Sequence, residues 1–294
     1  WERRFAHFDE VPVASASIGQ VHRARTVDGR ELALKVQYPG VGRSIASDVD
    51  NVATLLRIAQ VLPLGIDVED IAREAKRQLA QEADYLAESG FLERYARLVA
   101  DEPQIVVPRV HWDYTTARVM AMDYMNGEPL DSLAASTPQK ERDSVGALLQ
   151  KLMFRELFEF RVMQTDPNFA NYLYQPDTGR LVLLDFGATQ EFSPEYSERF
   201  RDITRAIVAG DRNGVERGAR SIGYIAEDAA PQVVTAALDM IELVCEPLRT
   251  TGAYDYGASD LPRRAREMGI DLAFKRGLLR MPPSDTMFLH RKLV

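Results

Sequence analysis

Four side chains in the sequence could together bind a phosphate group and a divalent cation. Asp185 follows a run of four apolar residues and would be exposed at the end of a strand. Asn171 precedes Asp185 by 14 residues, and Asp166 precedes Asn171 by five. Carboxylate and amide oxygens are ligands that Mg²⁺ accepts readily. Lys35 lies in an apolar stretch, where a buried ammonium needs a partner such as a phosphate or a carboxylate.

A loop of small residues precedes Lys35. It reads Ala14-Ser15-Ala16-Ser17-Ile18-Gly19, and small side chains allow backbone N–H groups to approach phosphate oxygens. An alanine- and serine-rich turn between strands is common, so the loop alone is weak evidence of a phosphate site. An acidic turn and a buried lysine without any function would explain Asp166, Asp185 and Lys35 one at a time. They do not explain why the loop, the lysine and the acidic segments occur together in this order and at these spacings.

Hydrophobic periodicity predicts the elements that must position these residues. Strands are expected at residues 11–16, 20–25 and 31–37, with a hairpin turn at Asp28-Gly29 between the last two. From Ser44 apolar residues recur every three or four positions, which predicts an amphipathic helix. A second long helix is then expected, capped by Asp67 and extending to about Leu98.

Two further strands, at residues 104–114 and 117–124, lead to a polar break at residues 126–129. Beyond this break the sequence is mostly helical, with short strands at 172–175 and 181–184. The predicted fold class is α+β. A strand-rich N-terminal lobe with an inserted helix pair (residues 1–125) would be joined to a helical C-terminal lobe (residues 126–294).

Composition narrows the function classes. The chain has 294 residues, of which 46% are hydrophobic and 27% charged, the profile of a globular protein. Its net charge of −8 argues against nucleic acid as a primary partner. No apolar run reaches the roughly 18 residues that a membrane span requires. The single Cys245 is expected to be a core residue in a reducing compartment.

Taken together, these segments resemble the UbiB/ADCK family of atypical kinases. The resemblance is carried by residues 12–22 (PVASASIGQVH), 33–41 (ALKVQYPGV), 82–88 (EADYLAE), 155–171 (RELFEFRVMQTDPNFAN), 183–191 (LLDFGATQE) and 289–292 (LHRK). It implies a bilobal, protein-kinase-like fold that binds ATP or ADP with Mg²⁺. The family's K-x-G-Q motif is expected upstream of Trp1, on an extension that covers the active site.

The resemblance also implies a role for each residue of the site. Asp166 would be the catalytic aspartate, Lys35 would contact the α- and β-phosphates, and Asn171 and Asp185 would bind the metal. Glu88 would pair with Lys35, and Glu82 and Asp84 would form the family's E-x-D motif on the same helix. The nucleotide would be bound by Ala14, Ser15, Ala16, Ser17, Ile18, Gly19 and Lys35, and its adenine by the linker residues Met122, Asp123, Tyr124 and Met125.

Departures from protein kinases argue against a protein substrate. Gln164-Thr165 replaces the His-Arg pair before the catalytic aspartate, and Asn168 replaces the lysine two residues after it. Ser193 follows Gly187 by only six residues, too few for a segment that docks a peptide.

The resemblance implies an ATPase or small-molecule kinase that supports ubiquinone (coenzyme Q) biosynthesis. Expected partners are the nucleotide, a membrane lipid or quinone precursor and other quinone-biosynthesis proteins. The expected location is peripheral to the bacterial inner membrane or on the matrix side of the mitochondrial one. The alternative is a nucleotide-sensing pseudokinase scaffold with negligible turnover. The oligomeric state and the phosphate acceptor are left open.

Overall fold

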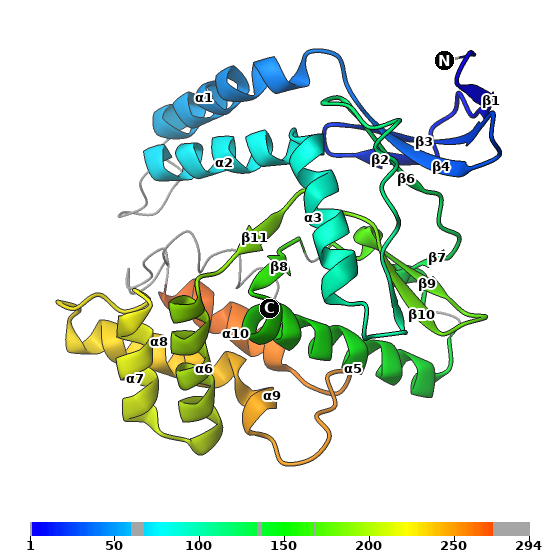
Figure 1. Ribbon diagram of the computed structural model, residues 1–294. Helices are drawn as coiled ribbons and strands as arrows, with labels where there is room; N and C mark the ends of the chain where they lie inside the picture. Colours follow the sequence, from blue (N-terminus) through cyan, green and yellow to red (C-terminus); the bar gives the residue numbers. More distant parts are fainter. Residues whose placement is uncertain (1, 60–67, 134–136, 167, 273–294) are drawn as a thin grey trace. The chain divides into compact units, whose positions relative to one another are not determined.

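The computed structural model describes residues 2–59, 68–133, 137–166 and 168–272 (Figure 1). Its contacts divide the chain into two compact units. The first comprises Trp1–Thr54 and Glu69–Glu191, and the second comprises Leu55–Val68 and Phe192–Val294. Helices and antiparallel strands both contribute, which confirms the predicted α+β class. The lobe division at residue 125 remains a prediction.

A five-stranded antiparallel sheet opens the first unit. Its order is β1-β3-β4-β6, with β2 paired to β3. The strands are β1 (Phe5–Phe8), β2 (Ala14–Ala16), β3 (Gly19–Thr26), β4 (Glu31–Gln37) and β6 (Val119–Asp123). The predicted hairpin is confirmed, since Gly29 at its turn has a φ of +90°, which glycine adopts readily. The strand predicted at 11–16 is confined to Ala14–Ala16.

Three helices follow β4, where two were expected. They are α1 (Val41–Ala59), α2 (Val68–Glu82) and α3 (Tyr85–Leu98). The single helix predicted from Asp67 to Leu98 is therefore wrong, although Asp67 itself lies outside the described residues. Asp84 interrupts it because its carboxylate accepts a hydrogen bond from the Ala87 amide and caps α3.

A second sheet has the order β5-β10-β9-β7. Its strands are β5 (Ile105–Val106), β7 (Glu128–Pro129), β9 (Tyr172–Gln175) and β10 (Arg180–Leu183). The prediction for 172–175 is confirmed, and the one for 181–184 is displaced by one residue. The strand predicted at 104–114 is wrong beyond Val106, because Pro108 lacks an amide for a ladder hydrogen bond. A two-stranded ladder pairs β8 (Val162–Gln164) with β11 (Thr189–Glu191).

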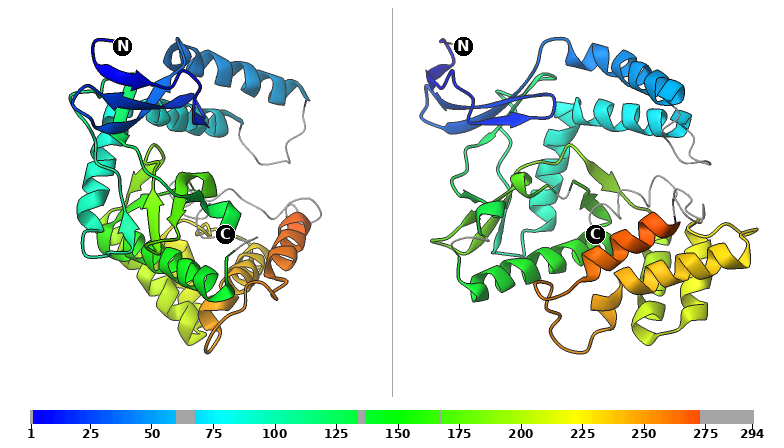
Figure 2. Two further views of the ribbon diagram at one scale, coloured as in Figure 1. Left: turned by 90° about the vertical axis from the view of Figure 1, so that its right-hand side faces the viewer. Right: turned by 180° about the vertical axis from the view of Figure 1, so that it is seen from behind.

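Helix α3 extends from the first sheet toward the second, as both views of Figure 2 show. Its buried face contributes to a core shared with α5 (Gln139–Arg155) and with strands of both sheets. A π-helical turn, η2 (Glu156–Phe160), continues α5 and ends at Arg161, which has a φ of +54°. Two short 3₁₀ turns, η1 (Leu130–Ser132) and η3 (Phe169–Asn171), complete the first unit.

The second unit is helical in its described part. It contains α6 (Pro194–Ala209), α7 (Arg212–Ser221), α8 (Pro231–Val244), α9 (Glu246–Arg249) and α10 (Leu261–Ile270). Ser193 and Asp211 cap α6 and α7 through their side chains, and Gly210 ends α6 in the left-handed region. Cys245 packs against the apolar core of these helices, and burial raises the pKa of its thiol to about 11, as expected for a core cysteine. None of the helices in the described ranges is long and apolar enough to span a membrane.

Candidate active site

Lys35, Glu88 and Asp185 meet in one hydrogen-bonded cluster. The Lys35 ammonium donates to both carboxylate oxygens of Glu88, at 2.8 and 3.0 Å, and to Oδ2 of Asp185 at 3.2 Å. Lys35 comes from β4, Glu88 from the first turn of α3, and Asp185 from the segment after β10. Only 8% of Lys35 and 1% of Glu88 is exposed to solvent, so this pair is buried. The fold thus brings together residues that are 53 and 150 positions apart.

A cleft adjoins this cluster within the first unit. Its lining residues are Ser17, Ile18, Lys35, Glu82, Asp166, Asp185, Gly187 and Ala188. The small-residue loop, the strand of the lysine, the end of α2 and the segment containing Asp166 therefore all reach one place. Six of these residues, Ser17, Ile18, Lys35, Glu82, Asp166 and Asp185, are ones that the sequence assigned to the site.

The cleft carries more negative than positive charge. One lysine faces the carboxylates of Glu88, Asp185, Glu82 and Asp166. Burial and the charge of Asp185 raise the pKa of Glu88 to about 7, and the same two effects raise the pKa of Glu82. Although burial opposes its ionisation, Asp185 has a lowered pKa because the Lys35 ammonium is adjacent. Burial also disfavours the Lys35 charge, but Glu88 and Asp185 raise the pKa of this lysine.

This donor set fits a cation that arrives with phosphate oxygens. In the described part of the chain, no group of three His, Cys, Asp or Glu side chains is arranged to hold a metal by itself. Mg²⁺ in nucleotide sites commonly takes one or two protein carboxylates and completes its shell with phosphates and water. Asp185 and Asn171 could supply the protein ligands. The Asn171 amide now donates to Oδ2 of Asp166 at 2.8 Å, and Oδ1 of Asp185 accepts from the Gly187 amide at 2.9 Å.

The small-residue loop is held close to the lysine strand. Ala14, Ser15 and Ala16 form β2 and pair with β3, with Ala16 opposite Gly19. A Cβ atom at Gly19 would lie 2.2 Å from the carbonyl oxygen of Val36, so no larger residue fits there without displacing backbone. The Ser17 side chain lies beside Glu82, where it partly offsets the rise in the Glu82 pKa. The loop therefore packs closely on β4 and lies beside the end of α2.

Asp84 contributes to the helix boundary. Its expected alignment with Glu88 on a continuous helix does not occur, because Asp84 lies outside α3 and caps it. Of the two E-x-D carboxylates, Glu82 lines the cleft, whereas Asp84 fixes the start of the helix that bears Glu88.

The linker residues Met122 to Met125 lie at and beyond the end of β6. Met122 is buried opposite Ala33. The backbone amides of Asp123 and Tyr124 already donate to the carbonyls of Arg109 and Glu31. Across the described residues, the Met125 amide has no such partner. The contact with adenine remains a prediction, and Met125 is the amide best able to make it.

Two buried polar residues behind Asp166 were not predicted. Glu156 and Gln164 are 0% and 2% exposed. The Gln164 backbone amide donates to the Glu156 carboxylate, and the Gln164 side-chain amide donates to the carbonyl of Asp166. A sequence signal for a buried Glu156 was available. It lies in the apolar helical stretch Glu-Leu-Phe-Glu-Phe, where a buried ionised side chain requires hydrogen-bond partners.

The family described as the ABC1 atypical kinase-like domain matches residues 1–219. The chain belongs to this family. This ABC1 domain is 38% identical over 293 residues to atypical kinase COQ8B, mitochondrial, of Rattus norvegicus, covering 100% of this chain and 55% of the relative. It is 33% identical over 294 residues to atypical kinase COQ8, mitochondrial, of Saccharomyces cerevisiae, covering 99% of this chain and 58% of the relative. The chain thus spans about half the length of these curated relatives.

A solved structure shares the fold. Rv3197 of Mycobacterium tuberculosis, determined in complex with erythromycin, superposes with a TM-score of 0.69 at 24% identity and covers all of this chain. The predicted resemblance and the kinase-like α+β fold are both confirmed for this ABC1 domain.

Proposed function

We propose that this ABC1 domain binds Mg-ATP in the cleft around Lys35 and turns it over, by hydrolysis or by transfer to a small molecule. The observation that carries the proposal is the contact of Lys35 with both Glu88 and Asp185, at 2.8 to 3.2 Å. A buried lysine held by a helix carboxylate beside a metal-binding aspartate is the arrangement that kinase-type phosphoryl transfer requires.

Each residue has a role that follows from its position. Glu88 orients the Lys35 ammonium, which would neutralise charge on the phosphates. Asp166 would accept the proton of the attacking hydroxyl or water, and Asn171 keeps the Asp166 carboxylate in place through the 2.8 Å hydrogen bond. Bound at Asp185 and Asn171, Mg²⁺ would supply further neutralisation of the phosphate charge.

The resemblance to UbiB/ADCK proteins connects this turnover with ubiquinone biosynthesis. We therefore propose a lipid or quinone precursor at a membrane surface as the neighbour of the site, with other quinone-biosynthesis proteins as partners. The location would be the bacterial inner membrane or its mitochondrial counterpart, and two relatives carry the word mitochondrial in their names. A generic protein substrate is disfavoured because α6 begins at Pro194, only seven residues after Gly187.

The alternative is a nucleotide-sensing scaffold that binds ATP or ADP with negligible turnover. The presence of Asp166 beside Lys35 in the cleft favours the enzyme, because a scaffold needs no general base.

Phosphate release from Mg-ATP, measured with and without vesicles containing quinone-like lipids, distinguishes the enzyme from the scaffold. Asp166→Asn should keep Mg-dependent nucleotide binding, measured by thermal shift, and should lose turnover by about 100-fold. Equal phosphate release by the wild type and Asp166→Asn would support the scaffold and contradict the enzyme.

A further inference from the structure

A chain of buried hydrogen bonds lies behind the segment that contains Asp166. Glu156 begins the π-helical turn, and its Oε1 accepts from the Tyr95 hydroxyl at 2.7 Å and from the Gln164 backbone amide at 3.0 Å. Burial and the nearby Glu156 charge raise the pKa of Tyr95 well above its usual value, so its hydroxyl stays a donor. All three residues are at most 2% exposed. None of them lines the cleft.

The chain continues from Gln164 to the catalytic segment. The Gln164 side-chain amide donates to the carbonyl of Asp166 at 2.8 Å, and its oxygen accepts from the Tyr172 hydroxyl at 3.2 Å. Glu156 therefore fixes the backbone of Gln164, and Gln164 in turn fixes the backbone of Asp166. The next residue, Thr165, is bonded through its amide and its hydroxyl to the carbonyl of Ala188.

At its other end this chain of hydrogen bonds reaches helix α3, which orients Lys35 through Glu88. Glu88 and Tyr95 are seven residues apart on α3, which places them on one face and about 10 Å apart along the axis. Both also contact Phe186. The Phe186 backbone is near enough to Glu88 to oppose the rise in the Glu88 pKa, and the Tyr95 ring centre lies 4.8 Å from that of Phe186.

Packing alone does not account for a carboxylate at this position. Replacing buried ionic groups by apolar residues of similar volume is often neutral or stabilising, so a buried glutamate is weak evidence for stability. The backbone around it is also unusual. A π-helical turn and the left-handed Arg161 redirect the chain from α5 into β8, which ends at Gln164. Single π-helical turns are frequent at functional sites.

We infer that Glu156 is a positioning residue that couples helix α3, which holds Lys35 through Glu88, to the backbone of Asp166. When α3 is in place, Tyr95 fixes Glu156, and Glu156 fixes the segment that bears the catalytic aspartate. The lysine and the aspartate are thereby held in one mutual arrangement. This inference rests on the proposed function, because the benefit of that arrangement is turnover.

Three variants test the coupling. Glu156→Met keeps the approximate volume but removes the Oε1 atom that accepts from both Tyr95 and Gln164, and Tyr95→Phe removes one donor of the chain. Tyr174→Phe is the matched control, because its hydroxyl reaches Glu141 at 3.4 Å in another part of the unit. The first two should lower kcat for ATP about tenfold and leave KM for ATP within twofold, whereas the control should change neither. A loss confined to KM, or an unchanged kcat in both variants, would overturn the inference.

Amide hydrogen exchange provides a readout that needs no turnover. Exchange in residues 162–172 should be about tenfold faster in Glu156→Met and in Tyr95→Phe than in the wild type, with β3 and β4 unchanged. Tyr174→Phe should leave residues 162–166 as they are. Unchanged exchange in both test variants contradicts the coupling, even if the wild type releases no phosphate. Absence of phosphate release by the wild type contradicts the proposed function alone. If Glu156→Met does not fold, kcat and amide exchange measured on Tyr95→Phe decide the question.

Discussion

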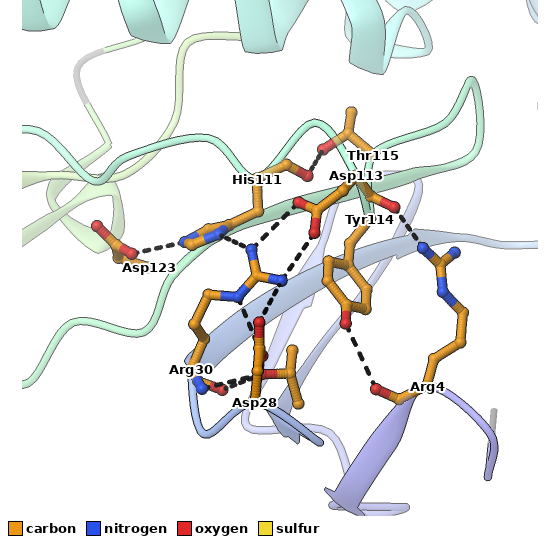
Figure 3. A network of polar contacts seen from close by, with 9 residues as sticks. Arg4, Asp28, Arg30, His111, Asp113, Tyr114, Thr115 and Asp123 are labelled. Carbon is orange, nitrogen blue, oxygen red and sulfur yellow. Dashed lines mark hydrogen bonds and ion pairs between the residues drawn. The ribbon is translucent and has the colours of Figure 1, made fainter.

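Two ion clusters lie along the same hairpin, and they differ in burial and in charge balance. At the β3–β4 turn, the Arg30 guanidinium bonds to Asp113 at 2.7 Å, to Asp28 at 2.9 Å and to His111 Nδ1 at 3.1 Å (Figure 3). Tyr114 lies beside this guanidinium and beside that of Arg4, with 5.0 and 4.5 Å to its ring centre (Figure 3). Further along β4, Lys35 is buried against Glu88 and Asp185.

The Arg30 cluster is more exposed and has one guanidinium against two carboxylates. Lys35 and Glu88 are buried, and with Asp185, Glu82 and Asp166 along the cleft one ammonium faces four carboxylates. Solvent screens an exposed cluster, so such pairs contribute little to stability. An excess of partly buried negative charge is costly unless a cation is bound beside it. The comparison therefore supports the proposal that the cleft near the end of β4 binds a cation together with its nucleotide.

The largest effect is expected from removing the buried cation. Lys35→Met leaves Glu88 without its partner, so the free energy of unfolding at pH 7.5 should fall by about 3–5 kcal/mol and turnover should be lost. Urea denaturation measures the free energy of unfolding, and phosphate release measures turnover. Adding Glu88→Gln should restore most of the stability but no turnover. Wild-type stability in Lys35→Met alone would show that the pair is not buried as described.

The next effect concerns the metal. Asp185→Asn removes the carboxylate that we propose as a metal ligand, so Mg-dependent nucleotide affinity should fall on the order of 100-fold. Thermal-shift titrations of ATP with and without Mg²⁺ measure it. Asp113→Asn, from the Arg30 cluster, is the matched control and should bind as the wild type does. Equal losses in both variants would remove the distinction between the two clusters.

A smaller effect, opposite in sign, is expected at Glu82. Its pKa is raised by burial and by Asp185, so the folded state binds protons more readily than the unfolded chain. This contribution therefore lowers stability as pH rises above the ordinary glutamate value. Glu82→Gln should raise Tm by about 2 °C at pH 7.5, and the gain should vanish below about pH 4. Turnover should nevertheless fall. Melting curves from pH 4 to 8 test the sign, and a Tm gain that is independent of pH contradicts it.

The smallest effect is expected from the exposed cluster. Arg30→Gln should lower Tm by about 2 °C at low ionic strength and by less in 0.5 M salt, because water and ions screen these pairs. Neither kcat nor KM for ATP should change. His111 connects Arg30 to the linker residue Asp123 through a 2.7 Å contact, so a higher KM would instead assign this cluster to the adenine site.

The sequence predicted most of the elements whose signals are local. The β3–β4 hairpin follows from alternation and from Asp28-Gly29, and the order of the motifs predicted which residues would meet around Lys35. The break at Asp84 was missed because no glycine or proline marks it, and aspartate can lie within a helix. Its N-cap role depends on the local backbone, and the neighbouring Ala83 carbonyl accepts from Gln37 on β4, 46 residues away.

The hydrogen-bond partners of Glu156 could not be predicted for a similar reason. Its partners Tyr95 and Gln164 are 61 and 8 residues away, and the π-helical turn that positions it has no dependable sequence signature. Conversely, a proline signal was available for the strand at 104–114, since Pro108 interrupts the alternation that predicted it.

Gly19 determines how the nucleotide loop can vary among functional sequences. The loop has alanines where flexibility would favour glycine, yet Gly19 is pressed against the Val36 carbonyl, where a Cβ atom would lie 2.2 Å away. Its role is to permit contact between strands. In a saturation library, Ala14 to Ser17 should accept several small residues, while Gly19 should accept none. Substitution within this loop is then limited at Gly19 by the strand beneath it, and a larger residue at that position would first require a change in β4.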